Sequence, residues 1–151
     1  MQVQQAAIPI ATDVHTITHL DGDYNRDYIA AANILFMSGE QLPVSPEKWA
    51  KKVQNRFGTE IVVIGLGAKG ALLTVRSDNF CERLPAVKTR PVINSIGAGD
   101  ALFSAFNHFY RTSQNPYTAL QRAILFASYK ISSPGAAAGF LTEINKNKDS
   151  V

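Results

Sequence analysis

The segment 94–100, Asn-Ser-Ile-Gly-Ala-Gly-Asp, combines two features that phosphoryl transfer requires. Gly97, Ala98 and Gly99 lack bulky side chains, so the backbone N–H groups of a helix beginning there would be open to an anion. Asp100 follows directly and could accept a proton from an attacking hydroxyl group. The helix dipole alone also favours an acid in a first turn, so a purely structural role of Asp100 is the alternative.

A second glycine-rich segment, residues 65–70, reads Gly-Leu-Gly-Ala-Lys-Gly and follows an apolar run. It matches the G-x-G-x-x-G pattern of dinucleotide-binding loops, which need a helix after the third glycine and an acid about twenty residues further on. Neither is present, because the next apolar run breaks at 76–78 and the chain reads Lys-Thr-Arg at 88–90. We therefore reject NAD or FAD binding. The segment could still hold a phosphate beside Lys69, or it could be only a hairpin turn with a solvated lysine.

Short apolar runs alternate with amphipathic stretches along the chain, which predicts an α/β fold. Ser45 and Pro46 supply a cap and a first-turn proline for a helix that Gly58 should end. Asn115 begins a final helix in the same way, with its end expected near residues 134–135. We expect strands at residues 8–14, 34–37, 60–64, 71–75 and 80–84, and helices at 24–32, 46–57, after 99 and after 115.

The composition suits one soluble domain with its own core, because 46% of the 151 residues are hydrophobic and 18% are charged. A formal net charge of +3 is spread along the sequence, so nucleic-acid binding is not implied. The apolar runs are too short for a membrane span and no signal peptide is recognisable, so we expect a cytoplasmic protein. Cys81 has no cysteine to pair with, and we expect a half-buried strand thiol rather than a reactive one.

Three further side chains near the beginning of the chain need an interpretation. Asp13 ends the first expected strand, at the sheet edge where open α/β folds bind ligands, so a site role is open to it. His15 and His19 lie four residues apart, as metal ligands on a helix do, but the intervening Thr-Ile-Thr favours a strand or loop. We expect both histidines to lie on the surface without a metal.

Residues 94–100 closely resemble the D-T-x-G-A-G-D signature of the PfkB, or ribokinase-like, carbohydrate kinases. Residues 63–70 resemble the V-T-L-G-x-x-G nucleotide loop of the same family, and both motifs occur in the family's order. The resemblance extends over nearly the whole chain and is to the C-terminal half of such a kinase. It implies a ribokinase-like three-layer α/β/α fold in which residues 1–151 form the nucleotide-binding and catalytic part, without the N-terminal half that carries the lid.

The resemblance also implies ATP-dependent phosphorylation of a hydroxyl group of a sugar or nucleoside, with ATP and Mg²⁺ as cofactors. Asp100 would be the general base, and Gly97, Ala98 and Gly99 would form the anion hole. The nucleotide contacts that it implies are Ser38, Gly65, Leu66, Gly67, Ala68, Lys69, Gly70 and Ile124. The metal positions are Glu40 for Mg²⁺ and its water, and Asn94, Ile96, Ser133, Gly135 and Gly139 for a monovalent cation such as K⁺.

The sequence departs from the family pattern at three of these motifs. In the nucleotide loop, Gly65 replaces a threonine, which removes a hydroxyl group that could reach a phosphate. Asn94 replaces the first aspartate of the signature, and residues 38–41, Ser-Gly-Glu-Gln, stand where the family has N-x-x-E. Together with the missing half, these departures support an opposing hypothesis, a non-catalytic nucleotide-binding or assembly module. In either case a half-sheet exposes an apolar edge, so we expect self-association or pairing with the missing half. We also expect the 151-residue chain to lack measurable kinase turnover alone.

Overall fold

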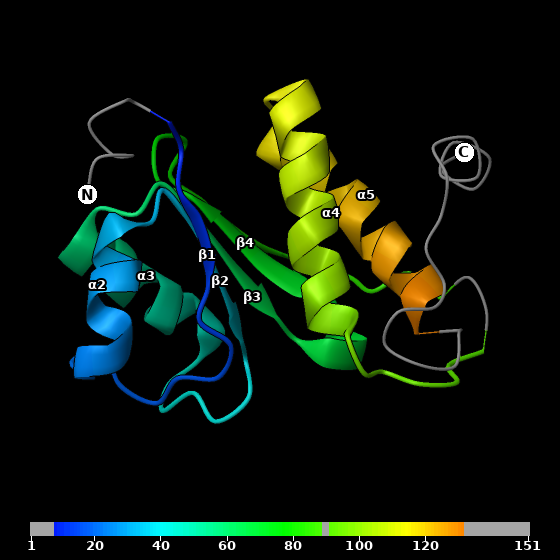
Figure 1. The fold of residues 1–151 in the computed structure, drawn as a ribbon, viewed down its shortest axis with the longest axis horizontal. Helices are drawn as coiled ribbons and strands as arrows, with labels where there is room; N and C mark the ends of the chain where they lie inside the picture. Colours follow the sequence, from blue (N-terminus) through cyan, green and yellow to red (C-terminus); the bar gives the residue numbers. More distant parts are fainter. Residues whose placement is uncertain (1–7, 89–90, 132–151) are drawn as a thin grey trace. The chain divides into compact units, whose positions relative to one another are not determined.

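The computed structural model describes residues 8–88 and 91–131, and the chain divides into two compact units, Met1–Leu84 and Pro85–Val151. Figure 1 shows the helices and strands along the chain. The first unit contains the whole sheet with two helices, and the second contains a pair of helices. Each unit is described by itself below. Among the described residues no helix is both long and apolar enough to cross a membrane.

The sheet of the first unit has five strands in the order β1-β2-β3-β4-β5. The first three strands are parallel, whereas β4 runs antiparallel to β3 and β5 antiparallel to β4. The carboxyl ends of β1, β2 and β3 therefore meet at one edge of the sheet, where β4 begins. The strands are β1 (Ala11–Asp13), β2 (Ile34–Ser38), β3 (Ile61–Gly65), β4 (Ala71–Val75) and β5 (Phe80–Leu84).

The two helices of this unit, α2 (Asp23–Ala31) and α3 (Pro46–Phe57), cover one face of the sheet (Figure 1). The Ser45 hydroxyl accepts a hydrogen bond from the Lys48 N–H at 3.4 Å, and Gly58 ends α3 with a φ of 70°, as the sequence predicted. The core between these helices and the sheet is apolar. Its buried members include Ile29, Leu35, Met37, Trp49, Val53, Val62, Ile64 and Leu72.

The second unit is a helical hairpin of α4 (Ala98–Ser113) and α5 (Pro116–Lys130), which pack side by side (Figure 1). Both helices have the expected amphipathic pattern, with Phe106 and Leu120 fully buried. The Asn115 side chain accepts hydrogen bonds from the N–H groups of Tyr117 and Thr118 at 3.0 and 3.1 Å, which confirms it as the cap of α5.

Three sequence expectations need correction. The first strand covers three residues rather than 8–14, because the backbone bends at His15, whose φ is 56°. The last helix ends at Lys130 rather than near 134–135, since the carbonyl of the next residue, Ile131, accepts the N–H groups of Ile93 and Asn94. Cys81 is exposed rather than half-buried, because β5 is the edge strand of the described sheet.

Candidate functional site

The carboxyl edge of the parallel strands joins three loops of the first unit through backbone hydrogen bonds. The Ser38 N–H donates to the His15 carbonyl at 2.7 Å, which connects the loop after β1 to the end of β2. The next N–H, that of Gly39, donates to the Gly65 carbonyl at 2.8 Å and connects β2 to the end of β3. Segments that are far apart in the sequence are therefore held together where open α/β folds bind their ligands.

Residues 65–70, which we call the strand turn, join β3 to β4 through a short 3-10 helix, η1 (Gly67–Lys69). The Leu66 N–H donates to the Gly70 carbonyl at 2.8 Å and closes the turn. Gly67 has a φ of 59°, and a Cβ added to it would meet no atom within 4 Å, so the backbone here is open to a ligand. Ala68 and Lys69 are also exposed. A strand follows the turn instead of a helix, as the rejection of dinucleotide binding predicted.

The loop after β2 carries the two other predicted ligand residues of this edge. Ser38 is half-buried, and its hydroxyl accepts a hydrogen bond from the N–H of Glu40 at 3.2 Å. The Glu40 side chain is exposed, and no salt bridge involves it among the residues that the structure describes. A hydroxyl and a carboxylate are therefore available beside the strand turn, and both are oxygen donors of the kind that Mg²⁺ and its bound water accept.

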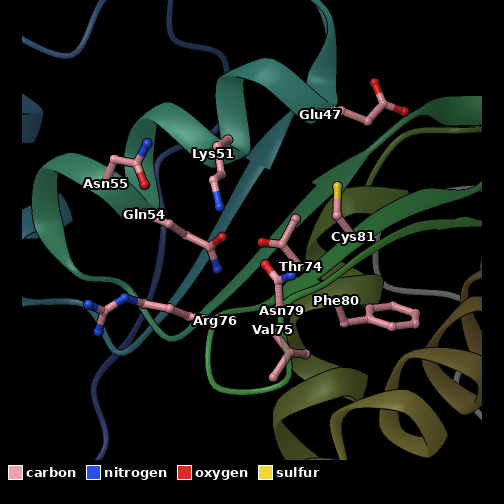
Figure 2. A pocket seen from close by; sticks show the side chains of 10 residues that line it. All are labelled: Glu47, Lys51, Gln54, Asn55, Thr74, Val75, Arg76, Asn79, Phe80 and Cys81. Carbon is pink, nitrogen blue, oxygen red and sulfur yellow. The ribbon is translucent and has the colours of Figure 1, made fainter.

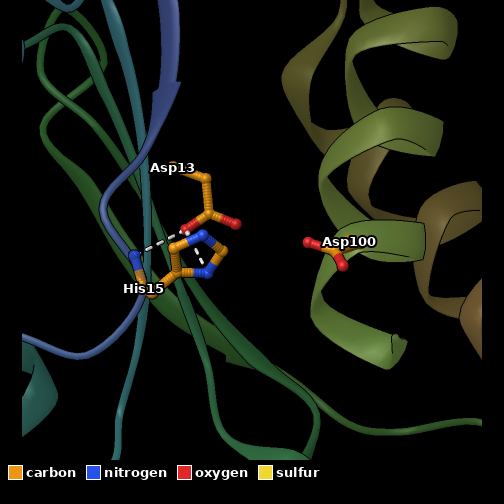
Figure 3. A group of neighbouring side chains, drawn as sticks. All are labelled: Asp13, His15 and Asp100. Carbon is orange, nitrogen blue, oxygen red and sulfur yellow. Dashed lines mark hydrogen bonds and ion pairs between the residues drawn. The ribbon is translucent and has the colours of Figure 1, made fainter. Parts of the chain in front are cut away.

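Asp13 holds the bend that follows β1 (Figure 3). Its carboxylate accepts a hydrogen bond from the backbone N–H of His15 at 2.8 Å, and the His15 ring nitrogen Nδ1 lies 3.8 Å from the same oxygen. The left-handed backbone of His15 is unusual for a residue other than glycine, and the Asp13 contact stabilises it. The His15 and His19 side chains are exposed, as expected.

The second unit contains the other glycine-rich segment, residues 94–100, which we call the helix turn. Gly97 precedes α4 with a φ of 80°, a left-handed conformation that glycine adopts without strain, and no described side chain caps the helix there. A Cβ at Gly99 would meet nothing within 4 Å, and Asp100 is exposed in the first helical turn. The N–H of Ala98 donates to the Ser95 carbonyl at 3.1 Å, whereas no described side chain caps the N–H groups that follow it, and the Asp100 carboxylate lies beside them.

The structure describes three of the remaining predicted site residues: Asn94, Ile96 and Ile124. The Asn94 side-chain oxygen accepts the N–H of Ile96 at 2.9 Å and stabilises the turn from within. Ile96 is 64% exposed, whereas Ile124 lies buried in α5. The other predicted cation ligands, Ser133, Gly135 and Gly139, lie outside the described residues.

A separate cavity of about 100 Å³ lies between α3 and the β4–β5 hairpin (Figure 2). It contains none of the predicted site residues. Cys81 is on its wall, and although the residue as a whole is exposed, partial desolvation of the thiol by the cavity wall, together with the nearby negative charge of Glu47, raises the thiol pKa. A raised pKa disfavours the nucleophilic thiolate, which agrees with the expectation that Cys81 is unreactive. The cavity is lined by Glu47, Lys51, Gln54, Asn55, Thr74, Val75, Arg76, Asn79, Phe80 and Cys81.

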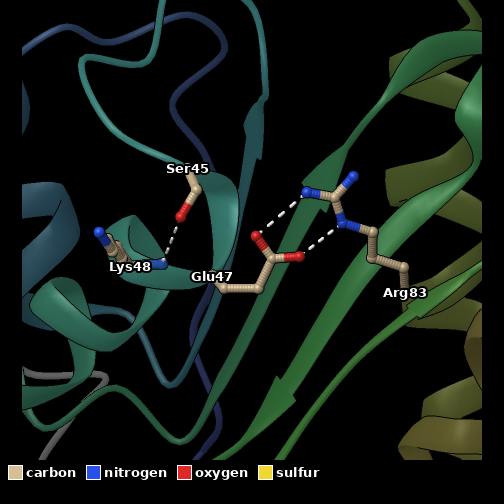
Figure 4. Close-up of polar contacts among 4 residues, drawn as sticks. All are labelled: Ser45, Glu47, Lys48 and Arg83. Atoms are coloured by element: carbon tan, nitrogen blue, oxygen red, sulfur yellow. Dashed lines mark hydrogen bonds and ion pairs between the residues drawn. The ribbon is translucent and has the colours of Figure 1, made fainter.

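An ion pair beside this cavity connects α3 to the edge strand (Figure 4). The Arg83 guanidinium donates two hydrogen bonds to the Glu47 carboxylate, at 2.5 and 3.1 Å. This contact lowers the pKa of Glu47. Since both side chains are partly exposed, the pair orients the hairpin more than it stabilises the fold.

The sequence did not point to two of the residues that organise the sheet edge. The backbone contact of Gly39 with Gly65 depends on which strands are neighbours, so no local pattern indicates it. The bend at His15 was also missed, although an aspartate two residues before it is a recognisable signal for a turn.

Comparison with known proteins identifies one family. The model of the pfkB family carbohydrate kinases matches residues 29–143. The acarbose 7(IV)-phosphotransferase of an Actinoplanes strain is 28% identical over 141 residues, covering 91% of this chain and 46% of that protein. The 1-phosphofructokinase of Haloferax volcanii is 31% identical over 140 residues, which are 89% of this chain and 44% of the relative. This chain thus spans about half the length of these curated relatives.

Solved structures give the same result for the fold. The microbiome-derived acarbose kinase Mak1 superposes with a TM-score of 0.87 at 24% identity, over 97% of this chain and 49% of that one. The ribokinase of Arabidopsis thaliana, solved with ribose and ATP, gives a TM-score of 0.80 at 19% identity over 97% of this chain and 48% of its own. These scores confirm the predicted ribokinase-like fold.

Proposed function

Because this chain belongs to the pfkB family of carbohydrate kinases, we propose that it is the nucleotide-binding and catalytic part of an enzyme that transfers a phosphoryl group from ATP to a hydroxyl group of a sugar or nucleoside. Relatives named as kinases of acarbose, deoxyribose and fructose phosphate support this substrate class. The observation that carries the proposal is the exposed Asp100 in the uncapped first turn of α4.

The helix turn performs two parts of the reaction in this proposal. Asp100 accepts the proton of the attacking hydroxyl group through its carboxylate. The predicted anion hole of Gly97, Ala98 and Gly99 stabilises the negative charge of the transferring group at the positive end of a helix of 16 residues. Gly99 is exposed there, whereas the Ala98 N–H already donates to the Ser95 carbonyl at 3.1 Å.

The strand turn binds the nucleotide in this proposal. ATP fits the observation that Gly67 has open space where a side chain would stand, so its backbone can approach a phosphate closely. Lys69 adds a mobile positive charge. Ile124, which the family resemblance assigns to the adenine pocket, is buried in the second unit, and its contact with the nucleotide stays a prediction. The assigned nucleotide contacts are Ser38, Gly65, Leu66, Gly67, Ala68, Lys69, Gly70 and Ile124.

Magnesium fits the oxygen donors at the same edge. Glu40 would hold it through water, with the Ser38 hydroxyl nearby, and a bound Mg²⁺ would neutralise charge on the phosphates. The solved ATP and Mg²⁺ complex of an Escherichia coli relative supports this cofactor pair. A K⁺ site at Asn94 and Ile96 stays a prediction. The side-chain oxygen of Asn94 already accepts a hydrogen bond within its turn.

The partner of this chain is also part of the proposal. The chain spans about half of its relatives, so we propose that it pairs with the missing half or with a second copy. A cytoplasmic location stays a prediction from the sequence. A second candidate function, a non-catalytic nucleotide-binding or assembly module, is favoured by Asn94 at the position of the signature aspartate and by the altered residues 38–41.

Titration calorimetry with ATP and Mg²⁺, together with an ADP-release assay over a panel of sugars and nucleosides, tests these functions. We expect the chain to bind ATP and the Asp100→Asn variant to bind it equally well. Any ADP release that disappears in Asp100→Asn supports the kinase. Because we expect no turnover from the chain alone, the release assay is also run with the chain joined to the N-terminal half of a pfkB-family kinase. Binding without Asp100-dependent release in that protein supports the module, and absence of ATP binding contradicts both.

A further inference from the structure

Gly39 lies just after β2, and its backbone extends the pairing between β2 and β3. That pairing ends at Ser38 opposite Gly65, and the N–H of Gly39 then donates to the Gly65 carbonyl at 2.8 Å. Gly65 is the first residue of the strand turn. A residue outside the turn therefore fixes the point at which the turn begins.

The structure leaves no room for a side chain at Gly39. A Cβ added there would lie 2.9 Å from Cδ2 of Leu66 and 3.0 Å from the carbonyl oxygen of Gly65. The leucine methyl can rotate away, but the oxygen belongs to the backbone and accepts the hydrogen bond of Gly39 itself. A larger residue at this position must therefore displace the strand turn or lose the hydrogen bond.

Gly65 shows the opposite behaviour, although it is the glycine that the sequence pattern points to. A Cβ on Gly65 would come no closer than 3.9 Å to another atom, the carbonyl oxygen of Met37. Its φ is also not positive. An alanine therefore fits at Gly65. At the contact between Gly39 and Gly65, it is Gly39 that needs to be glycine.

Displacement of Leu66 would reach the exposed part of the turn. The Leu66 side chain packs against the core of the first unit, and its N–H donates to the Gly70 carbonyl at 2.8 Å. Between these two residues lies η1, whose glycine has open space for a ligand. The position of Leu66 thus sets the position of the backbone that a phosphate would contact.

We propose that Gly39 is a positioning residue for the strand turn: because it has no side chain, the end of β2 can hold Gly65 and Leu66 where the backbone of residues 67–69 is presented to a nucleotide phosphate. The coupling between Gly39 and the turn is a property of the fold. Its consequence for nucleotide binding rests on the proposed function.

Amide hydrogen exchange tests the coupling without any nucleotide. In Gly39→Val we expect exchange of the Leu66 and Gly70 N–H groups to rise about tenfold, with a smaller rise in Gly39→Ala. The matched control is Gly65→Ala, which makes the same chemical change where space exists and should leave these N–H groups as in the wild type. Exchange of the β3 amides should not change in any of the three variants.

Unchanged exchange at Leu66 and Gly70 in Gly39→Val overturns the inference, and so does an equal rise throughout β3. The nucleotide part is tested by titration with ATP and Mg²⁺, where Gly39→Val should weaken affinity about tenfold. Leu66→Ala removes the methyl group nearest to residue 39. Combined with Gly39→Ala, it should therefore restore part of the ATP affinity that Gly39→Ala loses. If the wild type does not bind ATP while exchange changes as expected, the proposed function fails and the positioning role of Gly39 stands.

Discussion

The strand turn and the helix turn have similar compositions and different physical properties. The strand turn closes on itself through the Leu66 hydrogen bond to Gly70, and a strand follows it. The helix turn leads from Gly97 into α4, whose first N–H groups no described side chain caps. In the strand turn the glycines give an exposed backbone segment whose two ends are joined by a hydrogen bond. In the helix turn they stand at the positive end of a helix dipole. The element that follows the glycines decides which anion chemistry each turn can perform.

The two turns also differ in how firmly each holds the charged residue beside its glycines. Lys69 stands on an exposed turn and can interact with a phosphate only as a mobile, solvent-screened cation. Asp100 stands in a helical turn whose backbone fixes its position relative to the open N–H groups. Substitutions in the helix turn should therefore have larger effects than substitutions in the strand turn.

The largest effect is expected from Asp100→Asn. If the carboxylate is the general base, any phosphoryl transfer by this protein should fall about 10² to 10⁴-fold, because the amide cannot accept the proton. Affinity for ATP should remain, since the amide has nearly the same shape. The check is ADP release beside calorimetric titration. Full activity in this variant would leave Asp100 with only its role in the helix dipole.

A second large effect is expected from Gly97→Val. The left-handed φ of 80° is strained for a β-branched residue, which should cost about 1–3 kcal/mol of unfolding free energy and disturb the start of α4. Denaturant unfolding measures this change, and NMR titration with inorganic phosphate measures anion binding at the Gly99 amide. Gly99→Ala is the control, because its Cβ has open space and its stability should change little. Equal losses of stability and of phosphate binding in both variants would contradict the role assigned to the left-handed backbone of Gly97.

A smaller effect is expected in the strand turn. Lys69→Ala should weaken ATP binding roughly two- to fivefold, as is usual for an exposed charge, and the difference should shrink as salt is added. Titration at two ionic strengths measures it. A loss of ATP affinity in Lys69→Ala as large as the loss of phosphate affinity in Gly97→Val would mean that Lys69 is held in a fixed contact. The contrast between the two turns would then disappear.

The smallest effect is expected away from both turns, at Glu47. Arg83 lowers the pKa of this carboxylate in the folded state, so its contribution to stability is present above its usual pKa of 4.5 and is lost as the pH falls through the lower folded value. The Glu47→Gln variant should therefore have a slightly lower melting temperature than the wild type at pH 7. The two melting temperatures should become equal in acid. Thermal melts across that pH range, with nucleotide binding as a second readout, check it. A changed ATP affinity would contradict the independence of this hairpin from the site.

The sequence predicted most of the elements because their signals are local. Ser45 and Gly58 set the ends of α3 through a side-chain cap and a left-handed φ, both of which depend only on neighbouring residues. The apolar runs of β2 and β3 gave their strands for the same reason. Where the outcome depended on a distant partner, the prediction was wrong: α5 stops where the carbonyl of Ile131 accepts N–H groups from Ile93 and Asn94.

For the candidate site, the sequence by itself determined which residues have the chemical groups that phosphate binding and proton transfer need. The two glycine-rich segments, Lys69 and Asp100 were all identified from residue type and spacing, because phosphate binding and proton transfer need particular chemical groups. Only the tertiary structure decided which of the two glycines has no space for a side chain, since Gly39 and Gly65 are far apart in the sequence and meet at the ends of two paired strands. Strand neighbours are chosen by burial of the whole sheet face, and no local pattern of residues contains that information.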